Sequence, residues 1–243
     1  MSIAADERHH ELAAYIMSEE NWLLQVFQCA DTSIHKPSEV MTFVDHIIAG
    51  CSHAQDPSTL LVFSGGRTTA STRSEADGYL AVLETLIKCG RVPHPGLKYS
   101  GEHRATDSYQ NLLFSILRFR DMVGWYPDSV TVITHAFKER RFLELHAAAI
   151  KWPSSRIRVQ GMNPPFTLSE LDQTQRLEHE RAYKLFEADP YGAGPPLSEK
   201  RVARNWDPEL ADAGGNEEPV KRLLAWEGGV SGKEIFPECL PWQ

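Results

Sequence analysis

The sequence is poor in cysteine and has no long apolar run. Its 243 residues include four cysteines, none of them in a C-x-x-C pair, which excludes a disulfide framework and a structural zinc site. No stretch approaches the roughly 20 uninterrupted apolar residues of a membrane helix. The N-terminus has Asp6, Glu7 and Arg8 where a signal peptide would have a basic and then an apolar segment. We therefore expect a cytoplasmic protein without a membrane span.

Positive charge is scarce in the first quarter of the chain. Residues 1–60 hold two basic and nine acidic side chains, which account for nearly all of the formal net charge of -8. The remaining residues are close to neutral, and residues 118–158 carry eight basic against four acidic side chains. The net negative charge of the chain argues against binding of nucleic acid, whereas the basic segment 118–158 permits a local anion site.

The order of apolar segments predicts an α/β fold. Residues 59–63 form a continuous apolar run before a Gly-Gly pair, as in a strand buried in a parallel sheet. Beyond it we expect helices over 73–90, 106–123, 137–151 and 170–188, strands over 129–134 and 156–160, and a Pro/Gly-rich connection up to about residue 101. This alternation predicts a Rossmann-like, doubly wound, mainly parallel sheet with helices on both faces, in three layers.

Composition divides the chain into a domain and an extension. Residues 1–189 are expected to form the α/β domain, with a helical N-terminal segment over residues 1–50. Residues 190–243 are rich in Pro and Gly and should be irregular. Their large aromatic side chains, however, should be buried against the same domain. These aromatics are Tyr191, Trp206, Trp226 and Trp242.

A glycine turn follows the first predicted strand. Its candidate ligand-binding residues are Ser64, Gly65, Gly66, Arg67 and Thr68. At the carboxyl edge of a sheet, backbone N–H groups of such a turn can hold an anion, although a tight strand-to-helix turn is the alternative. Glu75 opens the next helix, where it either complements the helix dipole or serves the same site.

A second group of polar residues precedes and opens the helix expected over 106–123. Asp107 and Asn111 lie one turn apart there, and Glu102 comes just before them. Asp107 with Gln110 also makes a capping box. A structural role and the orientation of ligand hydroxyl groups therefore both remain open for these residues.

A third group follows the strand expected over 129–134. Lys138 and Arg141 should share one face near a helix N-terminus, where the dipole disfavours cations. We therefore expect compensation by anionic groups, which are Glu102 and Glu75, a ligand, or both. His135 is either a general acid or base or a packed core residue.

Together these segments resemble the domain of unknown function 218 family, whose bacterial members include SanA, ElyC and YdcF. The resemblance covers most of residues 20–206. It is carried by Phe63 to Gly66, Ser74-Glu75-Ala76, Glu102 with Asp107 and Asn111, and Thr134 to Arg141. The fungal branch is closer, through Trp22-Leu23-Leu24, Arg118-Phe119-Arg120, Asp189-Pro190-Tyr191-Gly192, Lys200-Arg201 and Arg204-Asn205.

The resemblance implies a Rossmann-like domain with a polar pocket, and an S-adenosylmethionine-like ligand has been considered for bacterial members. Two differences from the family limit what the resemblance implies for this chain. His135 and Lys138 stand where bacterial members usually have Ser and His. The segment before Trp22 has a helical pattern where relatives begin with a strand.

These residues predict an enzyme of unestablished reaction, acting by acid/base or transfer chemistry on a small anionic metabolite. Glu75, Glu102 and His135 are the candidate catalytic residues. The ligand would be held by Ser64 to Thr68, Asp107, Asn111, Lys138 and Arg141. Residues 189–205 would either cover the pocket or pack at its edge. The alternatives are a protein that binds S-adenosylmethionine or a nucleotide-like ligand, and a non-enzymatic interaction protein. No metal is expected, and a homo-oligomer remains open.

Overall fold

The computed structural model describes residues 11–24, 28–34, 36–68, 71–93, 95–207 and 217–243. The chain forms two compact units, Met1–His103 and Arg104–Gln243. In both units short parallel strands alternate with helices, so the expected mixed α/β class is confirmed. The parts of the predicted N-terminal helices that fall in 1–10 and 25–27 lie outside the described residues.

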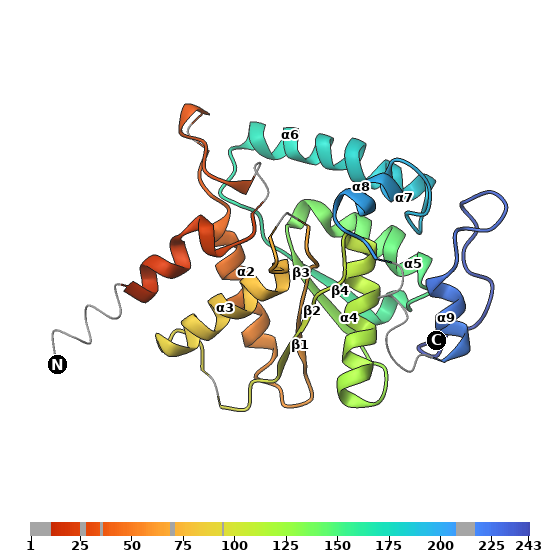
Figure 1. Cartoon of the computed structure of the whole chain (residues 1–243), viewed down its shortest axis with the longest axis horizontal. Helices are drawn as coiled ribbons and strands as arrows, with labels where there is room; N and C mark the ends of the chain where they lie inside the picture. The colour runs from red at the N-terminus through yellow and green to blue at the C-terminus, as the bar shows by residue number, and fades with distance from the viewer. Residues whose placement is uncertain (1–10, 25–27, 35, 69–70, 94, 208–216) are drawn as a thin grey trace. The chain divides into compact units, whose positions relative to one another are not determined.

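The first unit is built on a pair of parallel strands, β1 (Leu61–Ser64) and β2 (Tyr99–Glu102) (Figure 1). Residues 11–17 are helical. The other elements are η1 (Glu19–Asn21), η3 (Thr32–Ile34), α2 (Val40–His53) and α3 (Glu75–Lys88). Apolar side chains of α2 and α3 pack with Trp22 and Phe63 in one cluster. α3 begins with a capping box, because Ser74 and Asp77 each accept a hydrogen bond from the other's backbone N–H.

Strand β2 corrects the expectation of an irregular connection up to about residue 101. The strand is four residues long and includes Ser100 and Gly101, so it lacks the apolar run that marks β1. Its register pairs Leu61 with Tyr99 and Ser64 with Glu102. The pairing therefore places a glutamate beside the last residue of β1.

The second unit is built on the parallel strands β3 (Val130–Thr134) and β4 (Ile157–Gly161). Helix α4 (Ser108–Val123) packs its apolar side chains with those of the two strands and ends at Gly124, whose φ is 93°. The other elements are η4 (Ala136–Lys138), η5 (Arg141–His146), α5 (Ala147–Ala149), η6 (Ser154–Arg156), α6 (Leu168–Glu178), η7 (His179–Tyr183), α7 (Lys184–Ala188), α8 (Leu197–Ala203) and α9 (Glu218–Leu224).

Two helices that the sequence predicts as continuous are interrupted. The predicted helix over 137–151 is a 3₁₀ turn, the π-helical η5 and the short α5. The predicted helix over 170–188 consists of α6, the π-helical η7 and α7. Apolar spacing marks both segments as helical, but it does not report which carbonyl each N–H reaches. π-helical turns are rare and occur frequently at functional sites.

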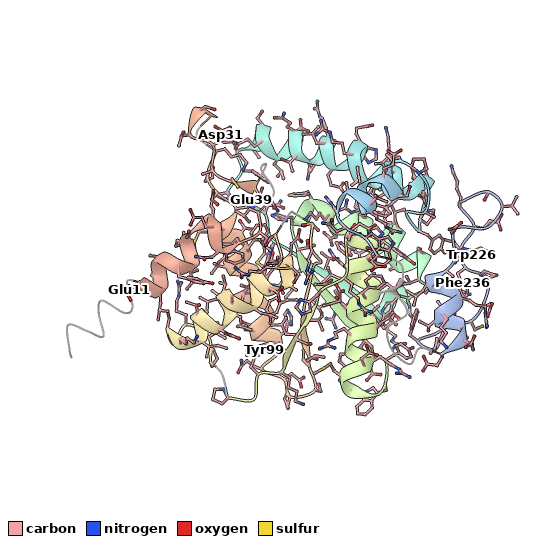
Figure 2. The ribbon with its side chains drawn as sticks, viewed as in Figure 1. Glu11, Asp31, Glu39, Tyr99, Trp226 and Phe236 are labelled. Atoms are coloured by element: carbon pink, nitrogen blue, oxygen red, sulfur yellow. The ribbon has the colours of Figure 1, made fainter. Side chains whose placement is uncertain are left out.

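The described residues of the extension 190–243 include the two short helices α8 and α9, and they contribute to the core of the second unit. Tyr191 and Trp242 are 3% and 2% exposed. The Tyr191 hydroxyl donates to the Ala149 carbonyl at 3.0 Å and accepts from the Phe236 N–H at 2.8 Å. The rings of Trp226 and Phe236 meet edge to face, with centroids 5.8 Å apart (Figure 2). This extension is therefore part of the packed unit.

Within the described residues, no helix combines the length and the apolar character needed to cross a membrane.

Candidate functional site

The glycine turn after β1 holds two of the candidate catalytic glutamates. Ser64 Oγ donates to Glu102 Oε2 at 2.6 Å, and the Gly65 N–H donates to the Glu102 carbonyl at 3.0 Å. Thr68 Oγ1 donates to Glu75 Oε1. Glu102 is only 2% exposed. The structure thus brings Glu75 and Glu102 to one turn, and each accepts a hydrogen bond from a hydroxyl group.

A glycine is needed at position 65 because the start of helix α3 lies very close to the backbone there. A Cβ atom on Gly65 would stand 2.7 Å from the Glu75 Cβ and 2.8 Å from its Oε2. The backbone N–H groups of Glu75 and Ala76 donate to the carbonyls of Gly66 and Gly65 at 3.0 and 3.1 Å. These bonds are those of a tight strand-to-helix turn. Arg67 is exposed. With two carboxylates beside it, the turn favours hydroxyl groups of a ligand over an anion.

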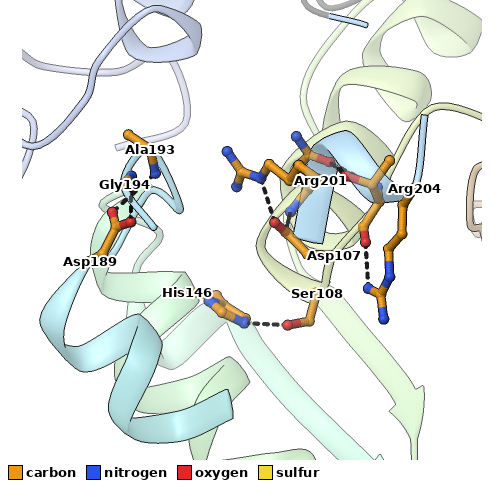
Figure 3. A network of polar contacts seen from close by, with 10 residues as sticks. Asp107, Ser108, His146, Asp189, Ala193, Gly194, Arg201 and Arg204 are labelled. Carbon is orange, nitrogen blue, oxygen red and sulfur yellow. Dashed lines mark hydrogen bonds and ion pairs between the residues drawn. The ribbon is translucent and has the colours of Figure 1, made fainter. Parts of the chain in front are cut away.

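In the second unit, Asp107 caps α4 and binds an arginine of α8. Its Oδ1 accepts from the Gln110 N–H at 2.9 Å, and its Oδ2 accepts from Arg201 Nε at 2.6 Å (Figure 3). The predicted capping box is wrong in its second half. The Gln110 side chain instead accepts from the N–H and hydroxyl of Thr106 at 2.8 and 2.7 Å. The Gln110 side chain is long enough to extend beyond the N-cap residue Asp107 to Thr106.

Arg201 lies against a glycine in the turn after α7. At Gly192, whose φ is 63°, a Cβ atom would stand 2.6 Å from Arg201 Nη2 and 2.8 Å from its Cζ. Asp189 holds this turn by accepting from the N–H groups of Ala193 and Gly194 at 3.1 and 2.8 Å (Figure 3). The turn formed by residues 189–192 thus lies directly against the Arg201 guanidinium group.

We predict that Gly192→Ala destabilises the protein by more than the cost of placing an alanine in a left-handed backbone conformation. A left-handed alanine costs about 1–2 kcal/mol, and displacing Arg201 from Asp107 adds about 1.5–3 kcal/mol for a lost bond between charged groups. Gly232→Ala is the matched control, because Gly232 has a φ of 72° and a Cβ atom there would meet nothing within 4 Å. Urea unfolding measures both; equal losses would show that Gly192 does not position Arg201.

Arg141 is the first residue of η5 and is buried, with 8% exposure. Its Nη1 lies 3.5 Å from Oε1 of Glu178, the last residue of α6. Burial lowers the pKa of Arg141, and Glu178 and Asp107 oppose this shift. Burial raises the pKa of Glu178 in spite of the nearby Arg141 and Lys138. The Nε of Arg141 and the Nη2 of Arg201 are both buried with no hydrogen-bond partner.

Positive charge exceeds negative charge around these groups. Arg204 Nη1 donates to the Thr106 carbonyl at 2.7 Å, and Lys200 Nζ donates to the Arg181 carbonyl at 3.2 Å. The pKa of Lys200 is lowered by burial and by the charges of Arg204 and Arg141. We call the following residues the arginine cluster: Arg141, Lys200, Arg201 and Arg204 with the carboxylates Asp107 and Glu178.

A serine and a histidine adjoin the arginine cluster. Oγ of Ser108, the first residue of α4, lies 2.8 Å from His146 Nε2 (Figure 3). His146 is fully buried, and its Nδ1 has no hydrogen-bond partner. Burial and the charges of Arg141 and Arg201 lower its pKa well below 6.5. The imidazole is therefore neutral at pH 7.

The remaining candidates also lie in the second unit. The Asn111 N–H donates to the Asp107 carbonyl at 2.8 Å within α4. His135 is 2% exposed and stacks on Phe137, with ring centroids 5.0 Å apart. Lys138 ends the 3₁₀ turn η4, whereas Arg141 begins η5. The two cations therefore belong to turns of different helical type, and both act on Glu178, whose pKa burial raises and these two charges lower.

Sequence reasoning overlooked Glu178 altogether. It lies at the end of α6, which buries none of its side chains, so no apolar pattern marks it. Arg201 and Arg204 were expected only as part of a segment that covers the pocket or packs at its edge, and both bind residues at or just before the start of α4. Among the described residues, no group of three or more His, Cys, Asp or Glu side chains could hold a metal ion.

The chain is similar to YOR238W, an uncharacterized protein of Saccharomyces cerevisiae. The two are 32% identical over 178 residues, which make up 67% of this chain and 59% of the yeast protein. The similarity thus spans less than two thirds of the yeast protein's length. No family model matches the chain. No solved structure matches it.

Proposed function

We propose that this protein binds a small anionic metabolite through the arginine cluster and acts on it as an enzyme. The observation that carries the binding proposal is that two buried guanidinium groups, those of Arg141 and Arg201, each retain an N–H without an acceptor. An unpaired buried donor costs about 1–3 kcal/mol, and more when it is charged. An oxyanion bound between them would accept both bonds and offset the excess positive charge.

The local backbone supports the same proposal. Arg141 begins one π-helical segment, and Glu178 immediately precedes the other. Such turns occur frequently at functional sites. Two separate helical segments thus each have a π-helical turn next to these buried charges, and this agrees with a ligand site there.

The chemical step would fall to acid/base residues. Glu75, Glu102 and His135 remain our proposed acid/base residues. An S-adenosylmethionine-like ligand is the second candidate, but its sulfonium group carries a positive charge, which the arginine cluster repels. The cluster therefore favours an anionic metabolite. We further propose that this metabolite is polar and that the protein is not solely an interaction module.

We also propose that the fold is the three-layer, doubly wound, Rossmann-like one. Two features support it: both strand pairs are parallel, and helices separate the successive strands. A crystal structure with β1 to β4 in one continuous sheet would agree. An antiparallel join between the pairs would contradict it.

Titration calorimetry tests the binding proposal. Inorganic phosphate and citrate, titrated at constant ionic strength, should bind, and Arg141→Gln or Arg201→Gln should weaken binding about tenfold or more, because each removes charge-assisted bonds worth about 1.5–3 kcal/mol. Arg140→Gln is the matched control. Its side chain is 65% exposed and paired with Glu144, so the change should be under about twofold. Absence of binding by both anions would contradict the proposal.

We predict that Glu178→Gln strengthens the binding of phosphate about tenfold or more. Its carboxylate lies 3.5 Å from Arg141 Nη1 and competes for that guanidinium group with any anion, through an interaction of a few kcal/mol at an effective dielectric constant near 20. Glu180→Gln is the control, because Glu180 is 58% exposed and paired with Lys184. If Glu178 were only a structural partner, its neutralisation would lower the melting temperature and leave the dissociation constant unchanged.

A further inference from the structure

The arginine cluster has a surplus of two positive charges. It contains four cationic side chains and two carboxylates, and arginine stays protonated in proteins. Burial lowers the pKa of Lys200 and that of His146. The charges of Arg204 and Arg141 lower the pKa of Lys200 further, and those of Arg141 and Arg201 lower that of His146 further. The charges of the arginines thus act on both groups in addition to burial.

Each arginine of the cluster is anchored by one part of its guanidinium group. Arg201 uses Nε for Asp107 and keeps a buried Nη2 without a partner. Arg141 Nη1 lies 3.5 Å from Glu178 Oε1 in an ion pair without a hydrogen bond, and its buried Nε has no partner. Arg204 is held at Nη1 by the Thr106 carbonyl. Groups fixed in this way lose little side-chain entropy when they bind an anion.

We infer that the group bound by the arginine cluster is a phosphate monoester dianion. This inference rests on the proposed function, because it specifies the anion for the same site. A dianion matches the surplus of two charges, whereas a carboxylate or a sulfate ester leaves one charge uncompensated. A phosphate monoester also presents three acceptor oxygens, enough for both open N–H groups and a third donor. A carboxylate has two.

The same chemistry occurs in inorganic phosphate, sugar phosphates and nucleoside monophosphates. Gly192 brings the backbone close to Arg201, and the Tyr109 ring lies 5.9 Å from the Arg201 Cζ on another side. These surroundings fix the phosphate group but not the remainder of the metabolite. The experiment therefore decides which of these compounds supplies the bound phosphate group.

Calorimetry with methyl phosphate and methyl sulfate at pH 7.5 tests the inference on the full chain. The two compounds have nearly the same shape. Methyl phosphate is mainly a dianion there, since its second pKa is about 6, and methyl sulfate is a monoanion. Methyl phosphate should bind about tenfold or more tightly. In Arg201→Gln this preference should fall to about threefold or less, whereas Arg140→Gln should retain it.

Two failures can be told apart. Equal binding of the two compounds would overturn the inference while leaving an anion site intact. No binding of either, together with none of phosphate or citrate, would remove the proposed function itself. Glucose 6-phosphate and adenosine monophosphate form the second arm. The compound that binds more tightly than methyl phosphate identifies the source, and weaker binding of both assigns the site to inorganic phosphate or another small monoester.

Discussion

Replacing Trp242 with alanine should lower the free energy of unfolding by about 3–5 kcal/mol, the usual cost of removing a large buried aromatic side chain. Trp242 is 2% exposed. Its ring centroid lies 5.1 Å from that of Tyr126 and 6.0 Å from that of Trp152. Its indole N–H donates to the Ile150 carbonyl at 2.8 Å. The substitution therefore opens a cavity and leaves a buried carbonyl without its donor.

Trp125→Ala is the matched control, because the same side chain is 67% exposed at that position. It should cost less than about 0.5 kcal/mol, as for most surface substitutions. Urea unfolding followed by far-ultraviolet circular dichroism measures both variants without relying on the fluorescence of the residue removed. A loss at Trp242 as small as that at Trp125 would mean that the C-terminal segment does not contribute to the folded core.

Acidification from pH 6.5 to 5 should cost the native protein up to about 2 kcal/mol through His146 alone. Its pKa is well below 6.5 in the native state, because of burial and the charges of Arg141 and Arg201. An unfolded histidine binds a proton as the pH falls through about 6.5, so the unfolded state holds more protons. Stability then falls by about 1.4 kcal/mol for each pH unit.

His146→Gln removes this titration and keeps a polar group near Ser108, whose Oγ lies 2.8 Å from His146 Nε2. At pH 6.5 the substitution should destabilise the protein. As the pH falls to 5, the difference between the two proteins should shrink by up to about 2 kcal/mol. Free energies of unfolding measured at four pH values are sufficient. Parallel curves would show that His146 takes up a proton in the native state as readily as in the unfolded one.

Much of the fold could be predicted because its signals are local. The expected strands over 129–134 and 156–160 correspond to β3 and β4, displaced by one residue at most. Helix α4 was expected from its apolar spacing, and the signals at its ends are the Asp107 cap and Gly124. Strand β2 carries no such signal. Its four residues are a strand because β1 pairs with them, and that pairing is tertiary.

The candidate site could be predicted only in part, for the same reason. Asp107 stood out as a helix cap, and Arg141 stood out as a cation near the N-terminus of a predicted helix. The partner of Asp107 is Arg201, ninety-four residues further along the chain, and no spacing rule connects positions so far apart. Glu178 resembles any exposed glutamate on a polar helix until packing places it 3.5 Å from Arg141. Local patterns thus reveal groups that can bind, and packing decides which of them meet.

The π-helical turn η5 makes the length of this segment as important as its residues. A π-turn contains one residue more than the α-helical turn it replaces, and each α-helical residue rotates the chain by about 100°. Deleting one residue between Arg141 and His146 would allow a regular helix and rotate one side chain away from the other. Surface loops tolerate insertions and deletions. In η5 such a change would disturb the relative orientation of Arg141 and His146 more than most substitutions would.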